Sequence, residues 1–201
     1  MRRCSESHGA DGRFTRVTEQ QNYVVVETRD GVERRHYPPC VVAEVRIDAP
    51  ADKAGNIAFR PLVNYISGAN RSTRKLAMTA PVLQEPAGHK LAMTAPVLQE
   101  RAGEGSWVVS FVLPGEGDLA DYPEPTDPAV SLRQVPAHDA AAVRYSGRWT
   151  TGNVDKHTAA LLSTVAEAGW KVAGSPRWAR YDPPWKPAFA RRNEVIVPLE
   201  P

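Results

Sequence analysis

Hydrophobic and polar residues alternate along several short stretches of the chain. Residues 23–28 are rich in β-branched side chains, 41–47 alternate between apolar and polar, and 107–114 form an apolar run that ends at a proline. Alternation with a period of two and short apolar runs are typical of β-strands. The pair Asp30-Gly31 is typical of a tight hairpin turn and precedes a further strand at 32–37. These stretches predict a chain rich in strands.

Two further stretches have apolar residues three and four positions apart, which is typical of one face of a helix. The first runs over 52–67 and is followed by Gly68, a residue type that often ends a helix. Pro61 lies inside this stretch, so we expect it to kink the helix or to mark a late start. The second runs over about 153–168 and is followed by Gly169. The positions on the two faces are Ala54, Ile57, Ala58, Leu62, Tyr65 and Ile66, and Val154, Thr158, Leu161, Leu162 and Val165.

The two halves of the chain resemble each other. Residues 35–46 align without gaps with 133–144 at an offset of 98, and a Pro-rich connector at 115–128 separates the halves. We expect an α+β fold in which two pseudo-symmetric ββαββ repeats form an eight-stranded twisted antiparallel sheet, or distorted open barrel, with two helices. The last strands are expected at 177–181 and 195–199, and the half-repeats at about 23–114 and 129–199.

One segment occurs twice, letter for letter, at 75–85 and 90–100. Each copy contains Met-Thr-Ala-Pro-Val, and a Pro-Ala-Gly-His turn separates the copies. Two copies are too few for a solenoid, which needs at least about three stacked repeats. Because proline cannot donate a hydrogen bond to a sheet, we expect each copy to be an extended edge segment broken by its proline.

The composition is that of a globular domain. Of 201 residues, 42% are hydrophobic and 24% charged, and 25 Lys and Arg against 23 Asp and Glu leave a net charge of +2. This balance argues against a nucleic-acid-binding surface, and no apolar run reaches the roughly 18 residues of a membrane span. Residues 1–19 contain no apolar leader, so we expect a loose tail on a soluble, cytoplasmic protein with a single domain at 20–199. We expect no disulfide between Cys4 and Cys40.

Several short segments are specific when taken together and in their order. They are 32–38, 59–68, the copies of Met-Thr-Ala-Pro-Val at 78–82 and 93–97, 111–114, 181–187 and 191–195. This set resembles the SOUL/haem-binding protein family across residues 20–199. The resemblance implies a haem- or tetrapyrrole-binding protein whose two repeats form a distorted barrel. It also implies an architecture similar to that of bacterial effector-binding domains, which take up varied small molecules.

The resemblance assigns His36 to the haem iron. His36 matches a histidine proposed as the axial ligand in some members of the family, and a neutral imidazole is a good iron ligand. The alternative is a half-exposed strand histidine that only contacts water. Met78 and Met93 offer thioether sulfur to iron, although a strand methionine is more often core filler. Tyr181 would line the porphyrin edge or ligate ferric iron as a phenolate.

The resemblance also implies that one helix forms a wall of the haem pocket. The matching stripe consists of Phe59, Leu62, Val63 and Ile66. An apolar helix face suits a flat porphyrin, so we expect Leu62 and Ile66 to line a cleft between helix and sheet. The alternative is that the stripe packs as ordinary core. The cations near enough in sequence to bind the propionates are Arg60, Arg71, Arg74 and Lys75.

A second class of function would use Glu194. If its side chain points into the barrel, Glu194 is a candidate general base with a raised pKa, beside Tyr181 in a small-molecule effector-binding or hydrolytic pocket. The alternative, which we favour, is a carboxylate paired with Arg191 or Arg192. The chain contains no GxSxG, P-loop or GxGxxG motif. We therefore expect non-catalytic binding of haem or another tetrapyrrole, for buffering, transport or sensing.

Overall fold

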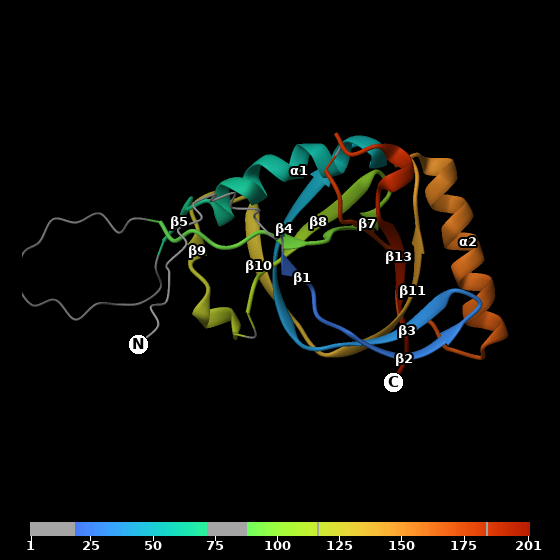
Figure 1. Cartoon of the computed structure of the whole chain (residues 1–201). Coiled ribbons are helices and arrows are strands. Elements are labelled where there is room, and N and C mark those ends of the chain that lie inside the picture. Colours follow the sequence, from blue (N-terminus) through green and yellow to red (C-terminus); the bar gives the residue numbers. More distant parts are fainter. Residues whose placement is uncertain (1–18, 72–87, 116, 184) are drawn as a thin grey trace, which may run out of the picture.

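The computed structural model of this chain describes residues 19–71, 88–115, 117–183 and 185–201. A curled antiparallel sheet forms an open half-barrel, and helices α1 and α2 lie against its outside (Figure 1). The expected α+β fold, with two helices on a curled antiparallel sheet, is confirmed. Among the described residues, no helix is both long and apolar enough to cross a membrane.

The elements have the following bounds. The sheet contains β2 (Val24–Arg29), β3 (Val32–Tyr37), β4 (Cys40–Asp48), β7 (Val97–Gly103), β8 (Ser106–Val112), β10 (Val130–Val135), β11 (His138–Tyr145), β12 (Arg177–Arg180) and β13 (Asn193–Pro198). The helices are α1 (Ala51–Ile66) and α2 (Thr151–Glu167), with short 3₁₀ turns η1 (Leu119–Asp121) and η2 (Ala188–Ala190). Two small pairings complete the fold: β1 (Glu19–Gln20) with β6 (Thr94–Ala95), and β5 (Asn70–Arg71) with β9 (Glu124–Pro125).

The strand order is consistent with the expected repeat. The order is β10-β4-β8-β7-β12-β13-β11-β3-β2, and every pairing in this sheet is antiparallel. Strands β3 and β10 begin at residues 32 and 130, and β4 and β11 begin at 40 and 138, so both pairs keep the offset of 98. The counterparts in the two halves are β3 and β10, β4 and β11, β7 and β12, and β8 and β13. If each strand is replaced by its counterpart, the same eight-strand order results, read from the opposite end.

The sheet has nine strands rather than the expected eight, because β2 adds to the edge beyond β3. The hairpin between them turns at Asp30 and Gly31, whose φ angles of 48° and 77° both lie in the left-handed region. Positive φ at both central residues is what a tight type I′ hairpin turn requires. The turn chemistry predicted from sequence is therefore confirmed.

The C-terminal part of the second copy of the duplicated segment does not lie at a sheet edge. This part lies in β7, which pairs with β8 on one side and with β12 on the other. Pro96 stands just before β7, so the strand itself keeps the N–H groups that two neighbours need. The first copy, residues 75–85, lies outside the described residues.

Both helices cover the same face of the sheet. α1 packs on β4 and β8, while α2 packs on β11 and β13, and Trp178 contacts the apolar clusters under both helices. α1 runs through Pro61 and starts at Ala51, so the proline does not mark a late start. Ile57 and Leu162 were expected on the buried faces but are exposed, because each lies at the margin of its stripe. Gly68 and Gly169, with φ angles of 118° and 72°, follow the helix ends as expected.

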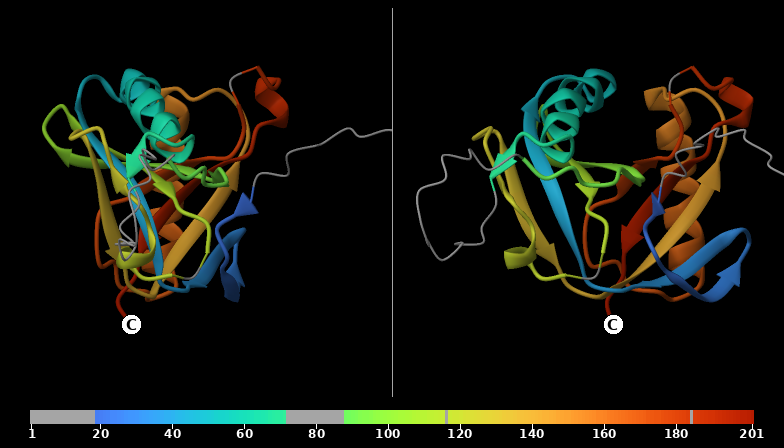
Figure 2. Two further views of the ribbon diagram at one scale, coloured as in Figure 1. Left: turned by 90° about the vertical axis from the view of Figure 1, so that its left-hand side faces the viewer. Right: turned by 60° about the vertical axis from the view of Figure 1, so that its left-hand side comes forward.

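The opposite face of the sheet is concave and carries its own apolar lining. Leu98 joins a cluster around Tyr37 and Ile196 to another around Cys40 and Val112. Figure 2 shows the strands curving around this face, with the helices on the outside. Because successive strand residues point to opposite faces, each strand gives alternate side chains to the helix-covered face and to the concave face.

Candidate binding site on the concave face

His36 lies on the face of β3 that points away from the concave side. Its neighbours Arg35 and Tyr37 are buried on the concave side, whereas the His36 side chain is 51% exposed. Its Nδ1 lies 2.8 Å from Oδ1 of Asp139, and Arg34 donates to the other carboxylate oxygen at 2.9 Å. Hydrogen bonds to His36 and Arg34 lower the pKa of Asp139. The assignment of His36 to iron stays a prediction.

The residues of the predicted helix wall are divided between core and surface. Leu62 and Ile66 are buried in the core between α1 and the sheet, with Val63 partly buried against it. Phe59 is 44% exposed, with its ring 5.7 Å from that of Phe111, and Arg60 is exposed. None of these side chains lines either of the two cavities described below. Their role in ligand binding stays a prediction.

The methionines and the remaining cations are not gathered at one place. Met78, Arg74 and Lys75 lie outside the described residues. Met93 is exposed just before β6, and Arg71 is exposed on β5. The structure therefore does not bring together His36, the helix stripe and Tyr181.

Glu194 on β13 is the centre of a buried ion-pair cluster. The carboxylate is 0% exposed and accepts two hydrogen bonds from the Arg35 guanidinium, at 2.7 and 3.2 Å. Arg192 donates to the same carboxylate at 2.7 and 3.0 Å. Burial alone would raise the pKa of Glu194, but the hydrogen bonds and charges of the two guanidinium groups hold it below its ordinary value. The favoured pairing of Glu194 with Arg192 is confirmed, and the other hypothesis, a general base with a raised pKa, is not supported.

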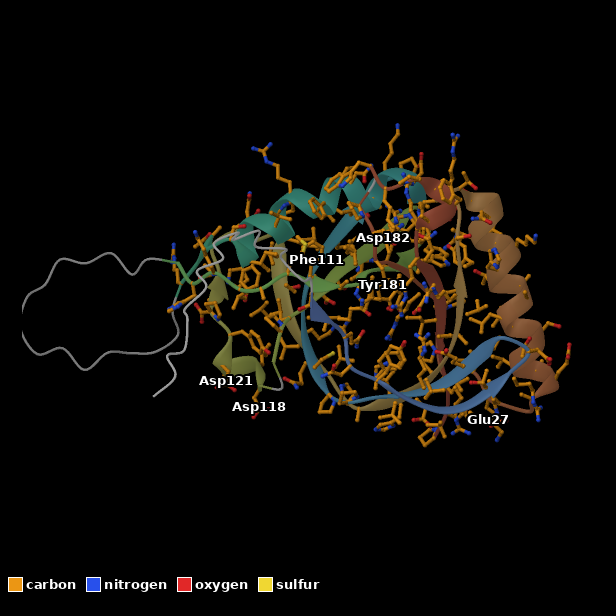
Figure 3. The ribbon with its side chains drawn as sticks, in the orientation of Figure 1. Glu27, Phe111, Asp118, Asp121, Tyr181 and Asp182 are labelled. Atoms are coloured by element: carbon orange, nitrogen blue, oxygen red, sulfur yellow. The ribbon has the colours of Figure 1, made fainter. Side chains whose placement is uncertain are left out.

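Tyr181, which directly follows β12 and is labelled in Figure 3, belongs to this cluster. Its hydroxyl donates to Oε2 of Glu194 at 2.8 Å, and Arg192 lies over its ring at 3.9 Å. Burial and the nearby Glu194 carboxylate raise the pKa of Tyr181, so its phenol stays protonated at neutral pH. The role of Tyr181 at a porphyrin edge or as an iron ligand stays a prediction. The cluster as a whole ties β3, β12 and β13 together on the concave face.

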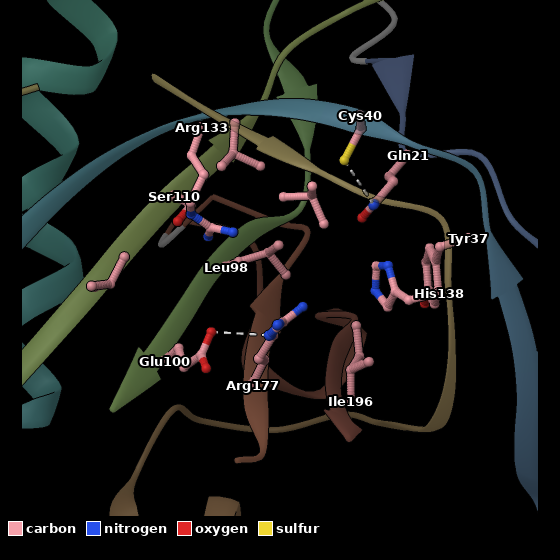
Figure 4. A pocket seen from close by; sticks show the side chains of 13 residues that line it. Gln21, Tyr37, Cys40, Leu98, Glu100, Ser110, Arg133, His138, Arg177 and Ile196 are labelled. Carbon is pink, nitrogen blue, oxygen red and sulfur yellow. Dashed lines mark hydrogen bonds and ion pairs between the residues drawn. The ribbon is translucent and has the colours of Figure 1, made fainter. Parts of the chain in front are cut away.

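A small inner pocket opens beside this cluster on the concave face (Figure 4). Its volume is about 30 Å³, room for about one water molecule. Apolar walls come from Val42, Leu98 and Ile196. Arg177 also lines it and is paired with Glu100 at 2.9 Å.

His138, the first residue of β11, points into the inner pocket with its ring stacked on that of Tyr37 at 5.4 Å (Figure 4). Its Nδ1 lies 3.0 Å from the carbonyl oxygen of Pro136. Because a carbonyl only accepts, this contact fixes the proton on Nδ1 and leaves Nε2 with a free lone pair. Burial lowers the pKa of His138, which favours the neutral ring.

A larger outer cleft lies next to the inner pocket. Its volume is about 440 Å³, within the range of small-molecule sites. Gln21 and Cys40 line both cavities, and the Gln21 amide donates to the Cys40 sulfur at 3.8 Å. Burial raises the pKa of the Cys40 thiol. The other residues of the cleft are Gln20, Asn22, Pro38, Pro39, Thr94, Val112, Leu113, Pro114 and Gly115.

Thr94 is an unpaired polar residue in the wall of the outer cleft. The residue is 5% exposed, and its Oγ1 is buried without a hydrogen-bond partner among the described residues. Buried hydroxyl groups are normally hydrogen-bonded, so an unpaired one in a residue that lines a cleft indicates a partner beyond the described protein atoms. This hydroxyl belongs to the second Met-Thr-Ala-Pro-Val copy.

A family model for the SOUL heme-binding proteins matches residues 18–198 of the chain. The chain belongs to the SOUL heme-binding protein family. No curated protein matches the chain closely enough to count as a relative. For this SOUL protein, solved structures therefore supply the remaining comparisons.

Solved structures similar to the SOUL chain share its fold at low identity. The C-terminal domain of EcmrR has a TM-score of 0.59 at 16% identity, covering 84% of this chain and 96% of that one. A hydrolase from Listeria innocua has a TM-score of 0.56 at 12% identity, covering 84% and 91%. An uncharacterized conserved protein from Listeria innocua has a TM-score of 0.54 at 13% identity, covering 84% and 92%. At these identities the likeness concerns the fold alone.

Sequence reasoning missed most of the concave face of the SOUL chain. It gave no role to His138, Arg35, Tyr37 or Gln21. The offset of 98 carried a usable signal, because it makes positions 40 and 138 equivalent and puts Cys40 and His138 on corresponding strands.

Proposed function

We propose that this protein binds haem or a related tetrapyrrole in the outer cleft, for buffering, transport or sensing rather than for catalysis. Membership of the SOUL heme-binding family supports the ligand class. The volume of about 440 Å³ supports the location, because a site for a small molecule needs a cavity of this order. Proline and valine side chains in its walls suit a flat apolar molecule.

The unpaired Thr94 hydroxyl is the observation that carries this proposal. Tetrapyrroles combine an apolar plate with carboxylate side chains. Thr94 stands in a wall of mixed amide and apolar side chains, and a hydroxyl donor there suits a carboxylate acceptor, because hydrogen bonds to charged groups are the strong ones. The residues present therefore fit a tetrapyrrole, with Thr94 as donor and Pro38, Pro39 and Val112 as apolar contacts.

The cluster around Glu194 argues against the alternative of a small-molecule effector-binding or hydrolytic pocket around Glu194 and Tyr181. A general base near neutral pH needs a raised pKa, and a cationic ligand needs an uncompensated carboxylate. Glu194 has neither property, since Arg35 and Arg192 both donate to it. We therefore assign the cluster to stability and the outer cleft to binding.

An absorption titration of the purified protein with hemin tests the proposal. We expect a saturable shift of the Soret band that ends at one equivalent, with matching quenching of tryptophan fluorescence. Tetraphenylporphine sulfonate, a flat anionic molecule without iron, should compete for the same site. Non-saturating changes, or several equivalents bound with equal affinity, would contradict the proposal.

Thr94→Val tests the location, because valine has nearly the same shape and lacks the hydroxyl. Hemin affinity should fall by about tenfold or more, the loss of a hydrogen bond to a charged group. The free energy of unfolding should not fall, because this hydroxyl has no partner among the described residues. Thr158→Val, which removes a hydroxyl bonded to Val154 on the distant α2, is the matched control and should leave hemin affinity unchanged. Equal affinities in the two variants would place the ligand elsewhere.

A further inference from the structure

The loop between β12 and β13 exposes two large aromatic side chains. Trp185 is 83% exposed and Phe189 is 82% exposed, more than any other large hydrophobic residue in the described part of the chain. Pro187 and Ala190 are exposed as well. Neither ring lines one of the two cavities. Aromatic rings lose favourable burial energy when they are left in water, so this apolar tip suits a partner that covers it.

Hydrogen bonds fix the backbone of this loop. The Arg191 side chain donates to the Lys186 carbonyl oxygen at 2.7 Å, across the loop. The N–H of Gly147, in the connection between β11 and α2, donates to the carbonyl oxygen of Ala188 in η2 at 2.9 Å. The two rings are therefore presented on a held backbone, and binding through them costs little ordering of the chain.

The surface around the two rings is cationic. The segments 144–150 and 181–191, which the contact between Gly147 and η2 joins, contain four cationic residues and one acidic residue. The acidic residue, Asp182, is paired with Lys186 at 2.7 Å, whereas Arg148 is exposed. The first six residues of α1 and of α2 each add one Asp and one Lys, so they leave this excess unchanged. Because the whole chain has a net charge of only +2, the excess is a local property of this end of the molecule.

We propose that this loop attaches the protein to the surface of an anionic lipid membrane, with Trp185 and Phe189 inserted among the headgroups. Aromatic rings prefer the interface between membrane and water, and arginine and lysine are attracted to anionic headgroups. Apolar insertion combined with basic residues is typical of proteins that lie on a membrane without spanning it. Two rings projecting from a loop would need matching cavities in a protein partner, whereas a lipid surface needs none. This inference does not depend on the proposed function.

Co-sedimentation of the full chain with lipid vesicles tests the insertion. Wild type should bind vesicles of equal parts phosphatidylcholine and phosphatidylserine, and bind phosphatidylcholine alone about fivefold more weakly or less. Trp185→Ser and Phe189→Ser should each lower the affinity for the anionic vesicles by about tenfold, because each removes a buried ring. Val24→Ser on β2, where Val24 is 65% exposed, is the control and should bind like wild type. Figure 2 shows β2 and η2 at opposite ends of the molecule.

Two further variants separate the charge from the ring. Arg148→Gln should weaken binding to anionic vesicles by about fivefold, whereas Arg29→Gln, which removes an exposed arginine from β2, should not. Trp185→Phe keeps an aromatic ring and should retain most of the binding. It should lose most of the blue shift that vesicles cause in tryptophan emission, because the other four tryptophans are buried or half-buried.

Three results would each overturn the proposal. The first is equal sedimentation of wild type and Trp185→Ser with anionic vesicles, or no sedimentation of either. The second is a lipid-free dimer in size-exclusion chromatography that Phe189→Ser converts to a monomer, because a second copy would then cover the rings. The third is a fall in hemin affinity in Trp185→Ser, which would assign the loop to tetrapyrrole binding; we expect the wild-type value.

Discussion

At the scale of single residues, Glu194 is a fully buried carboxylate that accepts hydrogen bonds from Arg35 and Arg192. Glu194→Gln keeps the shape of the side chain and removes the charge that faces Arg35 and Arg192. Breaking a buried ion pair by removing one partner costs about 3–5 kcal/mol, so we expect a loss of this size in urea unfolding. Glu200→Gln, which breaks an exposed 3.9 Å contact with Lys171, is the control and should change stability little.

The same carboxylate gives a pH dependence with a definite sign. Because its pKa in the folded protein is below the ordinary value of 4.5, Glu194 stabilises the fold fully above that value. This contribution is lost as the pH falls from about 4.5 through the folded pKa. Denaturant unfolding between pH 6 and pH 3 should therefore show a steeper loss of stability for wild type than for Glu194→Gln. Parallel curves would mean that Glu194 is not ionised in the fold.

Residue patterns predicted part of this site and missed the rest for a physical reason. Period-two alternation separates His36 from Arg35 and Tyr37, and that separation is present in the structure. The pattern alone does not say which of the two faces holds a cavity, because both faces of this sheet are apolar. The partner of Glu194 on the neighbouring half, Arg35, lies 159 positions away in sequence, beyond the reach of any local pattern.

At the scale of elements, a substitution in α1 distinguishes two roles for its apolar stripe: packing in the core and lining a ligand pocket. Leu62 is 0% exposed and packs in the cluster between α1 and the sheet. Leu62→Ala should therefore cost about 2–5 kcal/mol in thermal or urea unfolding. We propose that the ligand binds on the concave face, away from α1. Hemin affinity measured well below the unfolding temperature should therefore stay at the wild-type value. A large fall in affinity would instead support the helix wall implied by the family resemblance.

The position of each element along the chain could be predicted better than the strands with which it pairs. The helices start within two residues of the expected positions, and β3 and the hairpin turn fall where the pattern puts them. The interior place of β7 was missed, because a proline next to a strand suggests an edge. Pairing partners are set by tertiary packing. The residues of β7 do not themselves indicate that it pairs with β8 on one side and β12 on the other.

At the scale of the whole molecule, the offset of 98 was the most informative sequence feature. It predicted two related halves, and the order of eight strands is consistent with that expectation. It did not predict that the first strand of each half pairs with the other half, β3 with β11 and β10 with β4. This exchange closes the sheet into a half-barrel and brings Arg35 of one half to Glu194 of the other. The concave face is thus a product of both halves.

The central claim is that the ligand occupies the concave face, and paramagnetic broadening of backbone amide signals tests it most directly. Ferric hemin broadens amide signals near the iron, and zinc protoporphyrin, which is diamagnetic, serves as the control. We predict that hemin removes the signals of residues around both cavities and leaves those of α1 sharp. The signals expected to disappear are those of Cys40, Thr94, Val112, Leu113 and His138. Broadening centred on residues 59–66, with the signals of Cys40 and His138 retained, would contradict the account.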